Sequence, residues 1–275
     1  MKPAAFDYIR AETLDEVTSA LHERGSEARV IAGGQSLVAM LNMRLAKPSA
    51  LVDVMRVKAL AEIRVETDAV VIPAGVRQAA TMARPDLKDE VPLLAAALPW
   101  VGHLQTRSRG TICGSVAHAD PSAEIPLCLV ALEGEVRLRA RRRSRRVPAE
   151  AFFTGMMATD RGDDELIEAV AFPRRRPGAG YAFAEVARRH GDFAIVACAA
   201  VVEAERMRLA VAGVADRPTA RDLPMLDGAA LDDALNAFAW ELGAGDDVHA
   251  TARYRRELVR KLGRTVLEEA ASCRS

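Results

Sequence analysis

Two stretches rich in glycine and other small residues decide the fold of this chain: Ala32-Gly33-Gly34-Gln35-Ser36-Leu37 and, about 75 positions later, residues 110–124. The first follows a short β-run, Arg29-Val30-Ile31. Adjacent glycines allow positive φ and bring backbone N–H groups close to an anion with no Cβ in the way. The pattern suits a pyrophosphate, but it lacks the G-x-G-x-x-G spacing, so Asp53 is only weak support for a ribose contact. A tight strand-to-helix turn without a ligand is the alternative.

The second stretch reads Gly110-Thr111-Ile112-Cys113-Gly114-Ser115-Val116-Ala117-His118-Ala119-Asp120-Pro121-Ser122-Ala123-Glu124. Its small side chains allow close approach to a flat ring system, and its hydroxyls, imidazole and carboxylates supply hydrogen-bond partners. The structural alternative is a loop over residues 110–115 followed by a helix, with Asp120 as its cap and Pro121 at its first position.

Composition limits the possible functions. The chain has 275 residues with 38 basic and 38 acidic side chains, which argues against a bulk nucleic-acid binder. Seven arginines between Arg137 and Arg146 have no aromatic residue among them and indicate a solvated hairpin. No apolar leader and no long uncharged run occur, so we expect a cytoplasmic protein without a membrane span.

The cysteines and histidines predict no metal centre. The four cysteines form no C-x-x-C pair and the five histidines form no H-x-x-x-H pair. Zinc and iron–sulfur sites need several ligands that converge at short spacing. Redox chemistry in this chain would therefore depend on an organic cofactor.

The pattern of elements predicts an α+β fold of two α/β lobes and a smaller C-terminal lobe. We place lobe 1 at residues 1–55, lobe 2 at 56–176 and the C-terminal lobe at 177–275. The last helix is expected to bury Tyr254, Leu258, Leu262 and Val266. The expected helices are 14–25, 91–98, 230–242 and 248–271, and the expected strands are 29–31, 51–54, 69–72, 135–138, 166–172, 193–202 and 207–214.

Taken together, the two stretches resemble the FAD-binding medium subunit of the molybdenum hydroxylases, the family of xanthine dehydrogenase and aerobic carbon monoxide dehydrogenase. Further ordered matches run along essentially the whole chain. They are Met43-Arg44-Leu45, Asp164-Glu165-Leu166-Ile167 before Pro173, Arg188-Arg189-His190-Gly191-Asp192-Phe193-Ala194, and Gly213-Val214-Ala215 with Pro218.

The resemblance implies a PCMH-type FAD-binding fold with a C-terminal domain of the CO dehydrogenase flavoprotein type. It implies that residues 32–37 wrap the FAD pyrophosphate, that residues of the second stretch contact phosphate, ribityl chain or ring, and that Ile167 lies near the ring's edge. The implied cofactor contacts are Ala32, Gly33, Gly34, Gln35, Ser36, Leu37, Thr111, Gly114, Ser115, His118, Glu124 and Ile167.

Two positions depart from the family pattern. Cys113 stands where the family has the first glycine of a Thr-Ile-Gly-Gly sequence, and a positive φ there would cost on the order of 1 kcal/mol. Many members also carry a lysine near Glu185 that stabilises negative charge on the flavin, whereas no lysine occurs between Lys88 and Lys261. The lysine's absence bears on the reduction potential and the electron acceptor, and not on FAD binding.

The function implied is that of an electron-transfer subunit with no catalytic acid–base pair and no metal of its own. Electrons from a molybdopterin-binding large subunit would pass through the [2Fe–2S] clusters of a small subunit to FAD and then to an external acceptor. The implied assembly is an (αβγ)2 heterohexamer. A self-sufficient FAD-dependent oxidoreductase of the same fold and a binding protein that has lost its flavin are the alternatives. Two turns that lay far apart in the structure would contradict the assignment to an FAD-binding subunit.

Overall fold

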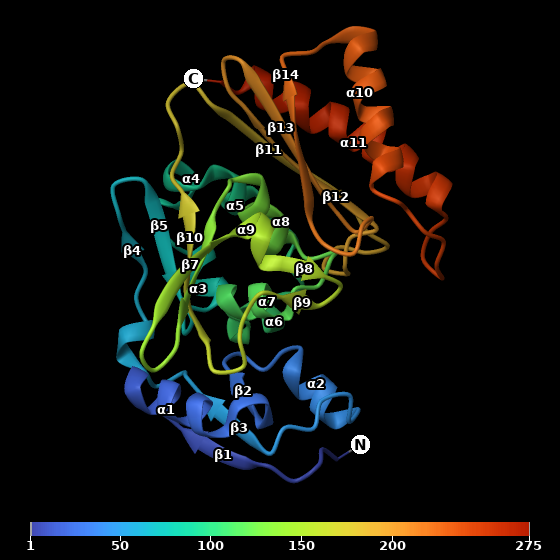
Figure 1. Ribbon diagram of the computed structural model, residues 1–275. Coiled ribbons are helices and arrows are strands. Elements are labelled where there is room, and N and C mark those ends of the chain that lie inside the picture. The colour runs from blue at the N-terminus through green and yellow to red at the C-terminus, as the bar shows by residue number, and fades with distance from the viewer. Residues whose placement is uncertain (1, 275) are drawn as a thin grey trace.

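The computed structural model describes residues 2–274, and its sheets follow one another along the molecule (Figure 1). The N-terminal sheet lies at one end, a larger sheet with most of the short helices lies in the middle, and a C-terminal sheet lies at the other end. This is the expected α+β architecture. The boundaries at 55/56 and 176/177 stay predictions.

Lobe 1 is a three-stranded parallel sheet in the order β1-β3-β2. Its first helix begins where expected, because the Thr13 hydroxyl accepts a hydrogen bond from the Glu16 amide at 3.2 Å, and it ends before Gly25. The elements are β1 (Asp7–Arg10), α1 (Leu14–Arg24), η1 (Gly25–Glu27), β2 (Ala28–Ile31), α2 (Leu37–Asn42) and β3 (Ala50–Asp53).

Lobe 2 contains a five-stranded antiparallel sheet in the order β4-β5-β10-β6-β7. The arginine-rich segment forms the β6–β7 hairpin at its edge, as predicted. The strands are β4 (Arg64–Val65), β5 (Ala69–Pro73), β6 (Glu135–Arg139), β7 (Ser144–Pro148) and β10 (Leu166–Pro173), with a separate hairpin of β8 (Phe153–Gly155) and β9 (Ala158–Thr159).

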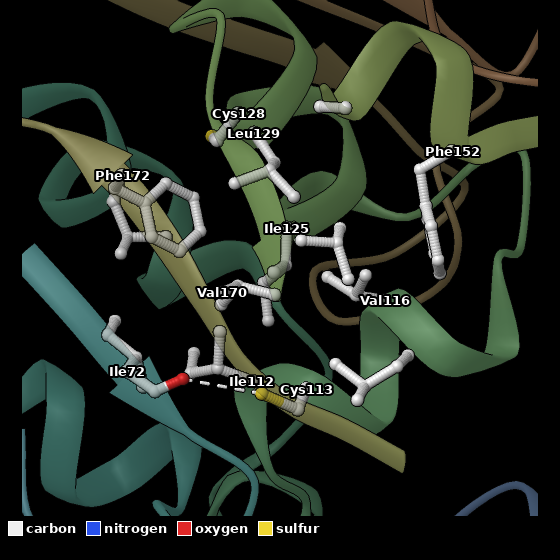
Figure 2. Packing of buried hydrophobic residues seen from close by; sticks show 14 of the residues in the cluster. Ile72, Ile112, Cys113, Val116, Ile125, Cys128, Leu129, Phe152, Val170 and Phe172 are labelled. Carbon is white, nitrogen blue, oxygen red and sulfur yellow. Dashed lines mark hydrogen bonds between the residues drawn. The ribbon is translucent and has the colours of Figure 1, made fainter. Parts of the chain in front are cut away.

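Short helices pack on this sheet and bury its apolar side chains. Figure 2 shows Val116, Ile125 and Leu129 of the helices against Val170 and Phe172 of β10. The helical elements are η2 (Lys58–Leu60), α3 (Gln78–Met82), α4 (Leu87–Glu90), α5 (Pro92–Ala97), η3 (Leu98–Trp100), α6 (Leu104–Arg109), α7 (Ile112–His118), α8 (Glu124–Ala131) and α9 (Ala149–Phe152).

The expected loop over residues 110–115 is wrong, because α7 begins at Ile112. The Thr111 hydroxyl caps this helix by accepting from the Gly114 amide at 3.0 Å. Asp120 caps no helix: its carboxylate accepts from the Ser122 amide at 2.9 Å in a turn, and α8 begins at Glu124. Pro121 therefore lies in this turn and not at a first helical position.

The C-terminal lobe is a four-stranded antiparallel meander with two long helices on one face. The other face packs on α5 and α8 of lobe 2. The edge strands β11 and β14 were not expected from the sequence. The elements are β11 (Gly180–Val186), β12 (Val196–Val202), β13 (Arg206–Ala212), β14 (Thr219–Pro224), α10 (Gly228–Glu241) and α11 (Ala252–Ser272).

The buried stripe of α11 differs from the expected one at its start. Tyr254 is 45% exposed, whereas Leu258 and Val266 are buried. A strict i+4 track drifts by roughly 40° per step around a helix of 3.6 residues per turn. The observed face therefore alternates i+3 and i+4 steps, through Val259 and Gly263 among others.

Candidate functional site

The first glycine turn leaves β2 and enters α2. Gly34 adopts φ +71°, and its carbonyl accepts from the Val38 amide at 3.0 Å. The Gln35 side-chain amide donates back to the Gly33 carbonyl at 3.3 Å. The Ser36 hydroxyl makes no capping hydrogen bond to α2. The turn thus has the strand–glycine–helix geometry that suits close approach of an anion.

The second stretch is held by the segment that follows β5. The Gln78 amide donates to the Gly110 carbonyl at 2.8 Å, and the Ile112 amide donates to the Val76 carbonyl at 3.3 Å. Thr111 forms an isolated antiparallel bridge with Arg77. These bonds fix the start of α7 beside the central sheet.

Cys113 is accommodated without backbone strain, since its φ is not positive. Its thiol donates to the Ile72 carbonyl at 3.3 Å within the core (Figure 2). Burial raises the pKa of this thiol to about 12, so it remains a packing group. The departure from the family glycine is therefore structurally tolerated.

The two stretches meet at Gly33. A β-carbon on this residue would lie 2.2 Å from the Arg109 carbonyl oxygen and 2.7 Å from the Gly110 Cα. Such distances leave no room for any side chain at position 33. Two turns far apart in sequence therefore lie against each other at the junction of lobes 1 and 2.

The expected contact residues differ in how accessible they are. Gln35 is exposed, and Ser36, Ser115 and His118 are partly exposed on the two stretches. Thr111 is buried, and its oxygen is engaged as the α7 cap. Ala32, Gly34 and Leu37 are partly exposed, Gly33 is buried, Gly114 is exposed, and Ile167 of β10 is buried.

Glu124 lies at the other end of the second stretch, where α8 begins. It is 4% exposed, and burial, with a further contribution from Asp120, raises its pKa to about 7. Helix α8 packs on β12 and β13 of the C-terminal lobe. A second buried acid, Glu185 of β11, is affected by its charge.

Sequence reasoning missed several residues at this junction. Gln78 is 5% exposed, and its side-chain oxygen is buried without a hydrogen-bond partner beside Gly110. The loop after β11 lies over residues preceding α6: a β-carbon on Gly191 would lie 2.5 Å from the His103 ring. Gly191 was the only sequence signal of this close approach, because glycine is the residue that readily adopts a positive φ. The φ of Gly191 is +87°.

Two other features belong to neither glycine stretch. Asp53, weakly suggested as a ribose contact, accepts from the Tyr8 hydroxyl and from the Met55 amide. A surface pocket of about 490 Å³ is lined by residues including Glu66, Arg137 and Arg174, and none of its lining residues belongs to either glycine stretch.

Two known protein families match this chain, one over lobes 1 and 2 and the other over the C-terminal lobe. Residues 4–175 match the family described as the FAD binding domain in molybdopterin dehydrogenase. Residues 181–270 match the CO dehydrogenase flavoprotein C-terminal domain. The chain belongs to the FAD-binding subunits of the molybdopterin dehydrogenases. This family member is an FAD flavoprotein and an oxidoreductase subunit, which confirms the cofactor and fold expected from the sequence.

Individual relatives match this chain over nearly the full length of both proteins. The 6-hydroxypseudooxynicotine dehydrogenase complex subunit alpha of Paenarthrobacter nicotinovorans is 35% identical over 98% of this chain and 96% of its own. Carbon monoxide dehydrogenase of Hydrogenophaga pseudoflava superposes with a TM-score of 0.93 at 28% identity, covering 100% of both chains. Quinoline 2-oxidoreductase of Pseudomonas putida 86 gives 0.91 at 31% identity over 99% of both.

The residues present fit an FAD molecule at the junction of the lobes. A backbone contact at Gly33 holds the two stretches together, and the exposed Gln35 and the Ser36 hydroxyl, which caps no helix, offer donors beside this contact. Among residues 2–274, no group of three or more His, Cys, Asp and Glu side chains is placed to hold a metal ion. No helix in the described part is long and apolar enough to cross a membrane.

Proposed function

We propose that this subunit transfers electrons within a molybdenum hydroxylase complex, from [2Fe–2S] clusters of a small subunit through FAD to an external acceptor. One observation carries the proposal: the contact of Gly33 with Arg109 and Gly110, which brings the two stretches to one place. When bound, FAD supplies the electron-accepting and electron-donating chemistry. The chain binds and orients it.

The individual contacts that we propose are those implied by the resemblance to the family. Residues 32–37 hold the pyrophosphate with backbone amides and the Gln35 and Ser36 side chains. Gly114, Ser115 and His118 of α7 contact the phosphate, ribityl chain or ring, with Thr111 shaping their turn. Glu124 contacts the flavin, and Ile167 contributes apolar surface near the ring.

The partners that we propose are a molybdopterin-binding large subunit and a [2Fe–2S] small subunit, in an (αβγ)2 heterohexamer. Relatives at about this length are themselves named as subunits of multi-subunit enzymes, which supports partners in general. A cytoplasmic location stays a prediction.

Purification of the full chain tests the function. A flavin absorption band with one FAD per chain is expected, and reduction of this FAD by substrate should require both partner subunits. A flavin-free chain that also fails to bind added FAD would contradict the proposal. Turnover of a substrate by the chain alone would favour the self-sufficient oxidoreductase instead.

A further inference from the structure

The turn that ends α2 exposes three consecutive side chains, Met43, Arg44 and Leu45. Met43 is 57% exposed and Leu45 is 69% exposed. Ala39, one helical turn before Met43, is exposed on the same face of α2. Figure 1 shows α2 at the edge of lobe 1, on the side where the N-terminus lies. Apolar side chains that gather at one exposed place beside charged groups are typical of an interaction surface.

Arg44 has a backbone conformation that arginine rarely adopts. Its φ is +57°, in the left-handed region where glycine is the usual residue at the end of a helix. The Arg44 amide donates to the Leu41 carbonyl at 3.0 Å, and the Leu45 amide donates to the Met40 carbonyl at 2.9 Å. The Arg44 guanidinium reaches the Lys2 carbonyl at 3.3 Å. A charged side chain at a position that favours glycine points to a role for that side chain.

The cations of this turn are not neutralised by acidic side chains of the same chain. Among residues 2–274, neither the guanidinium of Arg44 nor the ammonium group of Lys47 forms an ion pair. No acidic residue occurs anywhere in positions 28–52. The arginines of the central sheet differ, since Arg137 pairs with Glu66 at 2.7 Å. The end of α2 therefore presents positive charge to its surroundings.

This end of α2 lies close to the first glycine stretch. Helix α2 begins at Leu37, the last residue of that stretch, and the Gly34 carbonyl accepts from the Val38 amide at 3.0 Å. The helix has only six residues, so it spans about 9 Å at 1.5 Å per residue. A protein bound at the end of α2 would therefore lie near the turn that we propose for the FAD pyrophosphate.

We propose that this α2 surface, formed by Ala39, Met43, Arg44, Leu45 and Lys47, binds an acidic and apolar surface of a partner subunit in the complex. The inference rests on the proposed function, which supplies the complex. Met43 and Leu45 give apolar contact, and a methionine adapts its shape to the partner. The two cations pair with carboxylates of the partner and accelerate association.

Charge favours a partner subunit over a second copy of this chain. In a symmetric dimer the same patch of both copies would meet, so Arg44 and Lys47 would face their own counterparts. Like charges across an interface disfavour such a contact. An acidic partner surface has no such cost.

The test is the affinity of the purified FAD-loaded chain for a subcomplex of the large and small subunits, measured by surface-binding interferometry at several salt concentrations. Leu45→Asp should raise the Kd at least about tenfold, because it removes apolar contact and places a negative charge against acidic groups. The double variant Arg44→Gly/Lys47→Gln should also bind more weakly, and its Kd should depend less on salt than that of the wild type. FAD content should stay unchanged in all variants.

Arg44→Gly by itself separates docking from folding. Glycine relieves the positive φ, so the melting temperature should equal or exceed that of the wild type, whereas the Kd for the subcomplex should rise about threefold. Val248→Asp is the matched control for Leu45→Asp, because Val248 is 91% exposed in the segment before α11. This control should bind like the wild type.

Three results would overturn the inference. They are an unchanged affinity of the Leu45 variant, equal losses for the Leu45 and Val248 variants, and a self-association of the chain that Leu45→Asp removes, which would assign the surface to a second copy. A wild-type chain without affinity for the subcomplex would overturn both this inference and the proposed partners. A chain that binds no FAD but needs Leu45 to bind the subcomplex would overturn only the proposed electron-transfer function.

Discussion

Gly33 and Arg109 lie so close that a β-carbon on the glycine would stand 2.2 Å from the arginine's carbonyl oxygen. Gly33 follows β2 in lobe 1, whereas Arg109 ends α6 in lobe 2. Because the obstacle is backbone, no rotamer change relieves it. The geometry of this junction, where we propose that FAD binds, therefore depends on the absence of one side chain.

Gly33→Ala should displace one of the two turns and reduce the amount of FAD bound per chain at least tenfold. The measurement is the flavin-to-protein ratio after reconstitution, with circular dichroism to confirm folding. Gly245→Ala is the matched control, because a β-carbon there meets nothing within 4 Å. Full FAD occupancy in the Gly33 variant would show that the junction is not the binding site.

Cys113→Gly should lower stability without removing FAD. The thiol fills core space and donates to the Ile72 carbonyl, and glycine also weakens the α7 helix, so a loss of about 1–2 kcal/mol is expected. Urea unfolding measures the loss, with Cys273→Ser at the exposed C-terminal cysteine as control. Loss of FAD at unchanged fold would instead assign this side chain to the site.

Glu90→Gln should destabilise the protein by about 1 kcal/mol at neutral pH, because Arg84 loses the charged partner of a partly buried ion pair. The hydrogen bonds from Arg84 lower the pKa of Glu90 in the folded state. The stabilisation is therefore present above the ordinary glutamate pKa and is lost as pH falls through the folded value. Thermal unfolding of variant and wild type should accordingly converge in acid; a difference that persists there would contradict the pairing.

The carboxyl group of Glu185 makes the stability of the protein depend on pH in the opposite direction. Its folded pKa of about 8 lies above the ordinary value of 4.5, so its contribution to stability is present below 4.5 and is lost as pH rises toward 8. Glu185→Gln should make the melting temperature less sensitive to pH over this interval. An unchanged slope would mean that Glu185 is already ionised at neutral pH.

Arg208→Met should weaken the packing of the C-terminal lobe on lobe 2. Arg208 is 4% exposed on β13, and it bonds Asp222 at 3.0 Å, the Glu150 carboxylate and the Val130 carbonyl of lobe 2 at 3.3 Å. Loss of the buried bond should cost about 2 kcal/mol and speed proteolysis between β10 and β11. Arg253→Met at an exposed position of α11 should have little effect; equal effects would refute a special role for Arg208.

The amino-acid sequence by itself determined most elements and the nature of the cofactor. Local signals sufficed where the physics is local: Thr13 and Gly25 delimit α1, apolar runs form β5 and β10, and adjacent glycines mark the first turn. Residues 110–115 of the second stretch were predicted to form a loop because many small residues favour loops. A capping hydroxyl at Thr111 and tertiary packing of α7 outweighed that preference.

Only the tertiary structure decided which distant residues share a site. The approach of Gly33 to Arg109 and the burial of Glu185 without a hydrogen-bond partner depend on how separate lobes pack, and no sequence spacing encodes either one. The ionisation of a glutamate also depends on the tertiary structure. From the sequence a glutamate is expected to be charged, whereas burial without a nearby cation raises its pKa and favours the protonated form. Local preferences act over a few residues, whereas contacts and dielectric environment arise only when the lobes pack against each other.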